Sequence, residues 1–427
     1  MYDWANSAFV TTIISGLFPP YFAAVACKGV ADDVATFRLA LGTSIALAFI
    51  AILSPILGAV ADRAPIKKKM LAGFTTLGVI VSCALATVGT GDWVLGLVLF
   101  GVGNIAANGA FVFYDSLLPH VAREDELDRV SAAGYALGYV GGAVLLIVNA
   151  MMVMHPAWFG LADKGAAVRW SFVTVGVWWA VFAIPLFRRV AEPRVAPALD
   201  GPRGLAMVGA AFRDLGQTFR ELRRYRQAML LLVAFLIYND GIGTIIRMAT
   251  VYGHEIGLES GAMITALILV QLVGIPATFG FGALAAKIGT RAAIFLGIGV
   301  YCGVAIYGFF LKTQLDFYIL ASLVGLVQGG TQALSRSLFA RMIPKAKSSE
   351  FFGLFAVFEK FAGIFGPAVF AAATAIFGSS RPAILSIIAF FLIGGALLAT
   401  VDVKAGQAAA EAANAEANRA EAADGAT

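Results

Sequence analysis

Long apolar runs, separated by short polar turns, recur along the whole chain. A helix needs about 20 apolar residues to cross the hydrocarbon core of a bilayer. Twelve segments approach or exceed that length, and they predict an all-α polytopic membrane protein with twelve transmembrane helices. The expected spans are residues 1–26, 37–60, 70–90, 93–118, 130–154, 170–187, 227–250, 261–285, 292–312, 316–342, 351–377 and 382–401.

The composition supports this interpretation and argues against several soluble classes. Apolar residues make up 60% of the 427 residues and charged residues 13%, whereas soluble proteins carry about 25% charged residues. No polar stretch is long enough for a nucleic-acid-binding module, so no nucleic-acid partner is expected. The three cysteines, Cys27, Cys83 and Cys302, lie far apart and predict neither a disulfide framework nor a metal site.

The distribution of basic residues predicts the orientation of the spans. Short cytosolic loops of membrane proteins are enriched in Lys and Arg. With the N-terminus in the cytosol, twenty-two basic residues fall on the cytosolic side and six on the outer side. We therefore expect both termini in the cytosol, with Lys67, Lys68 and Lys69 as a simple anchor on that side. The expected location is the cytoplasmic (inner) membrane of a bacterium.

Two pairs of similar segments indicate an internal duplication. Residues 58–67, in the turn that runs to Lys69, align with residues 282–291 at a shift of 224, and residues 114–119 align with residues 339–344 at a shift of 225. Two pseudo-symmetric six-helix halves explain this repeat. The expected division is an N-terminal half at 1–187, a cytosolic Arg-rich linker at 188–226, a C-terminal half at 227–401 and a cytosolic Ala/Glu-rich tail at 402–427.

Three short motifs resemble a known family. The turn that contains Gly58, Asp62 and Arg63 resembles the loop motif of the major facilitator superfamily. Tyr-Asp-Trp-Ala-Asn-Ser-Ala at residues 2–8 and Phe-Pro-Pro-Tyr-Phe at 18–22 resemble the autophagy-related vacuole effluxer branch, also called the unknown major facilitator family. The resemblance implies the major facilitator fold and a gate contact of Asp62 and Arg63 that breaks as the halves rock. It also implies amino acids as solutes, because fungal members are associated with returning them from the vacuole.

Ionisable residues inside the spans are the candidate functional residues. A charge in the bilayer interior costs at least about 2.5–3.5 kcal/mol, so it is expected to face a polar cavity or a partner. Asp240, about 20 Å along span seven, is expected near the midplane. The expected substrate- and proton-binding residues are Asp240, Arg247, Asp3, Asn6, Thr244, Glu359, Lys360 and Arg336, and the expected gating residues are Asp62, Arg63 and Asp115.

Structural roles stay open for several of these residues. Arg247 could form a structural ion pair inside the protein, or its side chain could extend outward to the membrane surface. Arg336, Glu359 and Lys360 suit a cytosolic salt-bridge network at least as well as a solute site. Asp115 also suits a simple charge at a helix end.

Glycine and proline positions predict where the spans pack closely or bend. Gly134, Gly138 and Gly142 recur at every fourth residue and predict a smooth ridge on span five that another helix approaches. The pair Pro19–Pro20 predicts a kink in span one. Gly363, Gly366 and Pro367 predict a bend in span eleven.

No catalytic motif accompanies these charges. The sequence has no Gly-x-x-x-x-Gly-Lys-[Ser/Thr] phosphate loop, no Gly-x-Ser-x-Gly turn and no His-Glu-x-x-His motif. We therefore expect a transporter and not an enzyme, working as a monomer in the lipid bilayer with no cofactor and no metal. The expected activity is proton-coupled efflux of a small polar solute such as an amino acid, with Asp240, aided by Asp3 or Glu359, as the proton acceptor. A non-transporting receptor or scaffold on the same fold is the alternative, while a membrane enzyme would need an acid–base pair that the sequence does not offer.

Overall fold

Helices long enough to cross a membrane dominate the structure. The computed structural model describes residues 1–63, 66–193, 225–255, 257–258, 260–362, 365–377 and 380–424. Within these ranges, eleven helical segments are long and apolar enough to span a bilayer. The remaining expected span, the eleventh in the chain, is present as two shorter helices. The predicted arrangement of twelve spans is therefore confirmed.

The N-terminal half holds the first six spans. The expected kink at Pro19 and Pro20 takes the form of wider π-helical turns on either side of the prolines, within a segment that stays helical from Tyr2 to Ala26. The elements are α1 (Tyr2–Ala8), η1 (Phe9–Leu17), α2 (Phe18–Tyr21), η2 (Phe22–Ala26), α3 (Asp32–Arg63), α4 (Lys67–Ala84), η3 (Leu85–Thr87), α5 (Trp93–Ser116), α6 (Leu118–Val121), α7 (Leu127–Met154), η4 (Pro156–Phe159) and α8 (Lys164–Arg189).

The C-terminal half holds the other six spans and a tail helix. The bend predicted in span eleven is a break: Ala362 leaves the helical conformation after α14, and α15 begins at Phe365. The elements are α10 (Arg226–Glu255), α11 (Ser260–Ile288), α12 (Thr290–Phe309), α13 (Gln314–Arg341), η5 (Lys345–Lys347), α14 (Ser348–Phe361), α15 (Phe365–Phe377), α16 (Ser380–Thr400) and α17 (Val403–Asp424).

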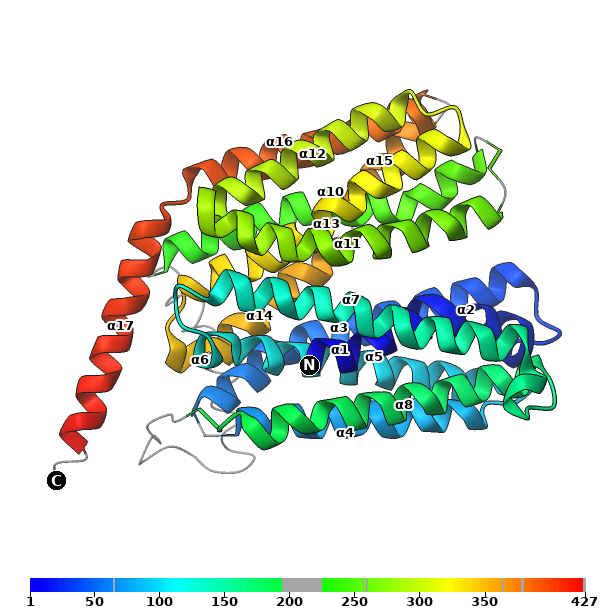
Figure 1. The fold of residues 1–427 in the computed structure, drawn as a ribbon, viewed down its shortest axis with the longest axis horizontal. Helices are drawn as coiled ribbons and strands as arrows, with labels where there is room; N and C mark the ends of the chain where they lie inside the picture. Colours follow the sequence, from blue (N-terminus) through cyan, green and yellow to red (C-terminus); the bar gives the residue numbers. More distant parts are fainter. Residues whose placement is uncertain are drawn as a thin grey trace.

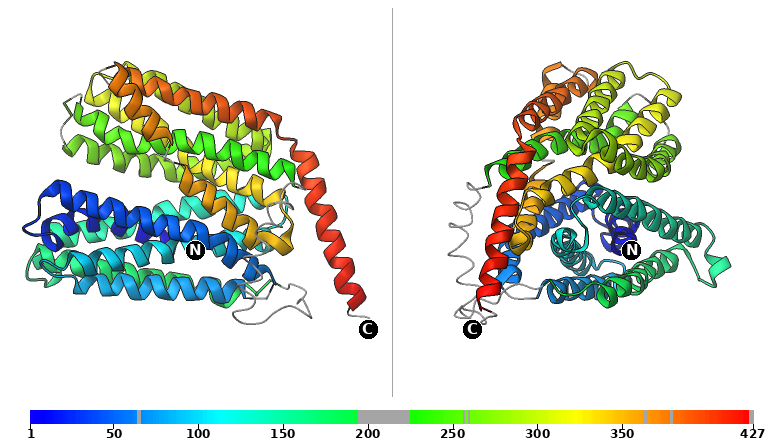
Figure 2. Two further views of the ribbon diagram at one scale, coloured as in Figure 1. Left: turned by 180° about the vertical axis from the view of Figure 1, so that it is seen from behind. Right: turned by 60° about the vertical axis from the view of Figure 1, so that its left-hand side comes forward.

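Each half has its own apolar core. Phe18 and Trp179 are fully buried in the core of the first half, and Tyr301 and Phe391 stack in the core of the second, 5.4 Å between ring centroids. Figures 1 and 2 show the two bundles side by side. The cores meet around α6 and the start of α7, where Leu118 and Leu127 of the first half pack with the core of the second.

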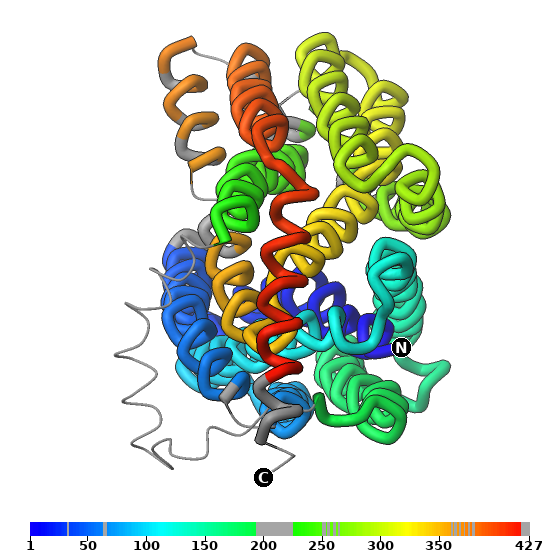
Figure 3. Tube along the Cα trace, turned by 90° about the vertical axis from the view of Figure 1, so that its left-hand side faces the viewer, coloured from blue at the N-terminus to red at the C-terminus, as the bar shows by residue number. Residues whose placement is uncertain are grey.

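One end of the molecule carries most of the contacts between the halves. We call it the linker-side end, because α8 ends there at Arg189 and α10 begins there at Arg226. Residues 194–224 of the expected linker lie outside the described ranges. At this end α14 packs against α3 and α5, and α7 packs against α11 and α13. Figure 3 looks onto this end.

The glycine ridge predicted on span five receives α1. A Cβ atom at Gly134 would collide with the Oδ2 atom of Asp3, and one at Gly138 would lie 2.7 Å from the Oγ atom of Ser7. Because glycine has no side chain, α1 approaches α7 closely and sets Asp3 against it. The ridge therefore fixes the position of a charged residue.

The Ala/Glu-rich tail forms α17, which runs across the linker-side end (Figures 1 and 3). Its start is held by Gln227, whose Oε1 atom accepts from the backbone N–H of Asp402 at 2.9 Å. Further along, Asn414 accepts from the backbone N–H of Lys345 at 2.9 Å, and Ala410 is buried. The tail is thus a docked helix.

Candidate functional site

A buried guanidinium joins the two halves near the linker-side end. Arg336 lies on α13, yet its side chain bonds to residues of the first half and is only 5% exposed. Its Nη1 atom pairs with the Oδ1 atom of Asp115 at 2.7 Å, and its Nη2 atom lies 3.9 Å from the Oδ2 atom of Asp3. Its Nε atom donates to the Oγ atom of Ser131 at 3.0 Å, and Nη2 donates to the Ser131 carbonyl at 3.1 Å. The guanidinium is therefore paired and hydrogen-bonded, as a buried charge must be.

Two tyrosines complete this cluster. The hydroxyl group of Tyr114 donates to the Oδ2 atom of Asp3 at 2.7 Å. The guanidinium of Arg336 lies over the ring of Tyr135, 4.5 Å from its centroid, and 5.8 Å from that of Tyr114. An aromatic face attracts a cation through its quadrupole. The cluster thus combines carboxylates, a hydroxyl, a carbonyl and two rings around one positive charge.

A second junction caps the start of α14. The carboxylate of Asp62, at the end of α3, accepts from the backbone N–H of Ser349 at 3.1 Å and from that of Glu350 at 2.7 Å. These donors belong to the first turn of a helix, where N–H groups lack helical partners and the dipole favours negative charge. Asp62 therefore acts as a helix cap supplied by the other half.

Lys67 belongs to this junction and corrects the expectation of a surface anchor. Its side chain is 0% exposed, and its Nζ atom lies 2.7 Å from Asp62 and donates to the Oγ atom of Ser348 at 2.7 Å. The Nε2 atom of His120 is 3.3 Å from Nζ and 3.1 Å from the Ser348 oxygen. The fold buries Lys67 because α14 covers it, which the basic run alone does not indicate. The side chain of Arg63 lies outside the described residues.

A third junction centres on Asp128, which is not among the residues that the sequence predicts to be functional. Its carboxylate accepts from the hydroxyl groups of Thr290 and Ser337, each at 2.5 Å, and pairs with Nη2 of Arg341 at 2.9 Å. The repeat offers one signal: Ala286 stands in the second half where Asp62 stands in the first. The carboxylate at the repeated turn is missing, and the first half supplies one instead.

Asp240 lies at the break in span eleven. It is 1% exposed, and its Oδ2 atom accepts from the backbone N–H of Gly366, in the first turn of α15, at 2.9 Å. Thr244 donates from its hydroxyl to the Asp240 carbonyl at 2.7 Å, and a Cβ atom at Gly366 would collide with that hydroxyl. Asp240 therefore caps α15, as Asp62 caps α14.

The other predicted residues are scattered. Arg247 is exposed on α10, two turns beyond Asp240. Glu359 is half-buried on α14, and the side chain of Lys360 lies outside the described residues. Asn6 is buried one turn from Asp3, and its amide has no hydrogen-bond partner among the described residues. Asp3, Asp115 and Arg336 thus form one cluster, while Asp240 and Thr244 lie at α15.

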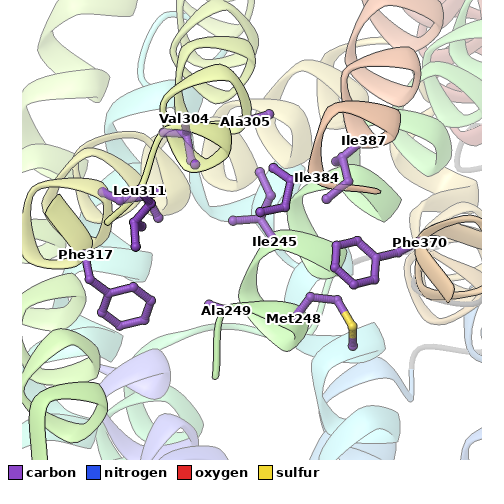
Figure 4. A pocket seen from close by; sticks show the side chains of 12 residues that line it. Ile245, Met248, Ala249, Val304, Ala305, Leu311, Phe317, Phe370, Ile384 and Ile387 are labelled. Atoms are coloured by element: carbon purple, nitrogen blue, oxygen red, sulfur yellow. The ribbon is translucent and has the colours of Figure 1, made fainter. Parts of the chain in front are cut away.

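A small apolar cavity of about 40 Å³ lies within the second half. Ile245, Met248, Phe317 and Phe370 are among the side chains around it, and Figure 4 shows them pointing into the space. Its lining is apolar, so it offers nothing to hold a polar solute. The cavity is therefore separate from the candidate site.

Solved structures share this fold. The Escherichia coli fucose:proton symporter FucP matches with a TM-score of 0.70, covering 94% of this chain and 96% of its own, at 14% identity. The proton:xylose symporter XylE of the major facilitator superfamily matches with a TM-score of 0.67, covering 94% of both chains, at 13% identity. At such identities the likeness establishes the fold alone, and it is the major facilitator fold that the sequence predicts.

Sequence relatives identify the family. Residues 1–411 match the family model described as "Vacuole effluxer Atg22 like". The uncharacterised MFS-type transporter YxiO of Bacillus subtilis is 37% identical over 410 residues, which cover 94% of this chain and 93% of YxiO. Autophagy-related protein 22-1 of Penicillium rubens is 27% identical over 310 residues, covering 67% of this chain and 51% of the fungal protein, so the match spans about half of that relative. The chain is thus an integral membrane transporter of the major facilitator superfamily and belongs to its Atg22-like vacuole effluxer family.

Proposed function

We propose that this chain is a secondary transporter that moves a small polar solute by alternating access. The carrying observation is the junction at the linker-side end, where Asp115, Asp62 and Asp128 of the first half bond to groups of the second. A hydrogen bond of this kind contributes about 0.5–3 kcal/mol net, because water replaces the lost partner when it breaks. The halves can therefore part at this end while each keeps its own core.

In the proposed orientation, the linker-side end faces the cytosol of a bacterium, because the basic loops gather there. The three junctions are closed in this structure, so this conformation is the one that blocks exchange with the cytosol. Asp62 and Lys67 both belong to the first half and pair at 2.7 Å. Their pair stays together when α14 leaves, which lowers the cost of opening.

We place the proton-coupling step at Asp240. Its carboxylate holds the N-terminus of α15 through a hydrogen bond and through the helix dipole. Protonation removes the negative charge, weakens that hold, and so links proton binding to the position of the second half of span eleven. Amino acid efflux is the proposed activity: the description of the family as vacuole effluxers supports efflux, and amino acids are the solutes that the sequence resemblance implies.

The substitution Asp240→Asn tests this role. Asparagine is as good a helix cap as aspartate, so the fold is expected to stay intact while the titratable charge is lost. In proteoliposomes with an imposed pH gradient and a mixture of labelled amino acids, pH-driven flux is expected to fall to background. The matched control is Asp125→Asn, at a side chain that is 70% exposed, and it is expected to transport like the parent.

Two results would overturn parts of the proposal. Full pH-driven flux in Asp240→Asn would remove this carboxylate from the coupling step. Solute binding by the parent protein without any flux would instead favour the receptor alternative.

A further inference from the structure

We propose that the first half contains a binding pocket for a guanidinium or ammonium group of the solute, and that Arg336 occupies this pocket in the closed state. The inference rests on the proposed alternating access and adds a substrate class, cationic solutes. When the halves part at the linker-side end, Arg336 leaves with α13. The pocket is then open to a cation that approaches from the cytosol.

The described ligands of the guanidinium all come from the first half. Asp3 lies on α1, Asp115 on α5, and Ser131 and Tyr135 on α7. Within this described set of contacts, the second half contributes the guanidinium. These groups are also suited to bind a guanidinium, because its planar fork of N–H donors fits carboxylate and carbonyl oxygens and stacks on aromatic faces.

The pocket stays assembled when the side chain of Arg336 leaves it. The hydroxyl group of Tyr114 holds Asp3 at 2.7 Å, and the close contact of Asp3 with α7 at Gly134 fixes that carboxylate further. Both interactions lie within the first half. Withdrawal of Arg336 therefore leaves the carboxylates of Asp3 and Asp115 in place without the cation that they share in the closed state.

Two neighbouring carboxylates in a membrane protein without a counter-ion are strongly disfavoured. A solute with a guanidinium or ammonium group removes this penalty and reproduces the bonds that Arg336 makes. A neutral solute of the same shape does not. Solute binding and closure then compete for the same carboxylates, so closure onto Arg336 displaces the cation.

The first experiment empties the pocket with Arg336→Ala in the full-length, detergent-purified protein. The variant is expected to melt at a lower temperature than the parent. Methylguanidinium should restore the melting temperature at a concentration at least about tenfold lower than methylurea, its uncharged analogue of similar shape, since hydrogen bonds to charged groups are the stronger ones. Arg123→Ala, at a side chain that is 78% exposed, is the matched control and should show no such difference.

The second experiment uses the parent protein, so it does not depend on how the variant folds. Binding of arginine and of citrulline, in which an uncharged urea group replaces the guanidinium, is compared by isothermal titration calorimetry. Arginine is expected to bind at least about tenfold more tightly. Asp115→Asn should reduce this preference, while Asp125→Asn should leave it unchanged.

The outcomes separate the inference from the function on which it rests. Equal effects of methylguanidinium and methylurea on Arg336→Ala, or equal binding of arginine and citrulline, would overturn the cation pocket. Flux of neutral amino acids in the same preparation would still support the transporter. Selective binding of arginine without flux of any solute would support the pocket and overturn alternating access.

Discussion

At the scale of residues, the sequence locates charges more easily than it locates their partners. Arg336 and Asp115 stand out because charges inside apolar spans are costly. Their pairing depends on α5 and α13 meeting across the two halves, which no local pattern indicates. Asp128 is harder to recognise, because it follows the exposed acidic residues 124–126 and resembles one more helix-end charge. Packing against the start of α12 and against α13 buries it.

The Asp128 junction gives a prediction at this scale. Asp128→Asn and Arg341→Gln should each favour opening of the linker-side end. The double substitution should change the free energy of opening by less than the sum of the two single changes, because both remove the same ion pair. We expect a coupling free energy of about 0.5–3 kcal/mol in the double-mutant cycle. Distances between spin labels at the linker-side ends of α7 and α11 measure the opening. Strict additivity would show that the pair does not hold the gate.

At the scale of elements, apolar length predicts the spans well, and glycine spacing predicts the ridge on α7. Contacts between particular helices are less accessible. α3 and α14 touch through their backbones, because a Cβ atom at Gly353 would lie 2.6 Å from the Ser54 carbonyl and one at Gly58 would collide with the Ser349 carbonyl. Single glycines in apolar spans are common, so the sequence does not distinguish these two.

Gly353→Ala is therefore expected to wedge α14 away from α3. Overpacking costs about 1–3 kcal/mol in the closed state, while the open state has room for the methyl group. The linker-side end should open more often, measured as faster maleimide labelling of a cysteine placed on the buried face of α14. Gly73→Ala is the control, because a Cβ atom there meets open space. Unchanged labelling in Gly353→Ala would argue against backbone contact as part of the gate.

At the scale of the whole molecule, the sequence predicts the twelve spans and the two halves, because both are carried by long apolar runs and a repeat. It does not predict which end is closed, since closure depends on contacts between halves that are distant in the chain. The sequence also does not predict that α17 docks on the linker-side end. Alanine and glutamate favour a helix, but they do not say where that helix rests.

Removal of α17 is expected to loosen the closed end. The helix is bound to the second half through Gln227 and Lys345, and its residues Ala410 and Asn414 face a small cavity that Glu124 of the first half also lines. A chain that ends at Asp402 should therefore show a larger open population in single-molecule energy transfer. A chain that ends at Asp424 is the control. Equal populations in both would leave α17 without a part in closure.

The three junctions between the halves draw their carboxylates from the same side. Asp3, Asp62, Asp115 and Asp128 all belong to the first half, and they face Arg336, Arg341, hydroxyls or helix N–H groups of the second. Two copies of the first half would set like charges against each other at these points. Although the sequence repeat predicts two similar halves, these charges mean that one half cannot replace the other, and the interface determines which surface each half accepts as its partner.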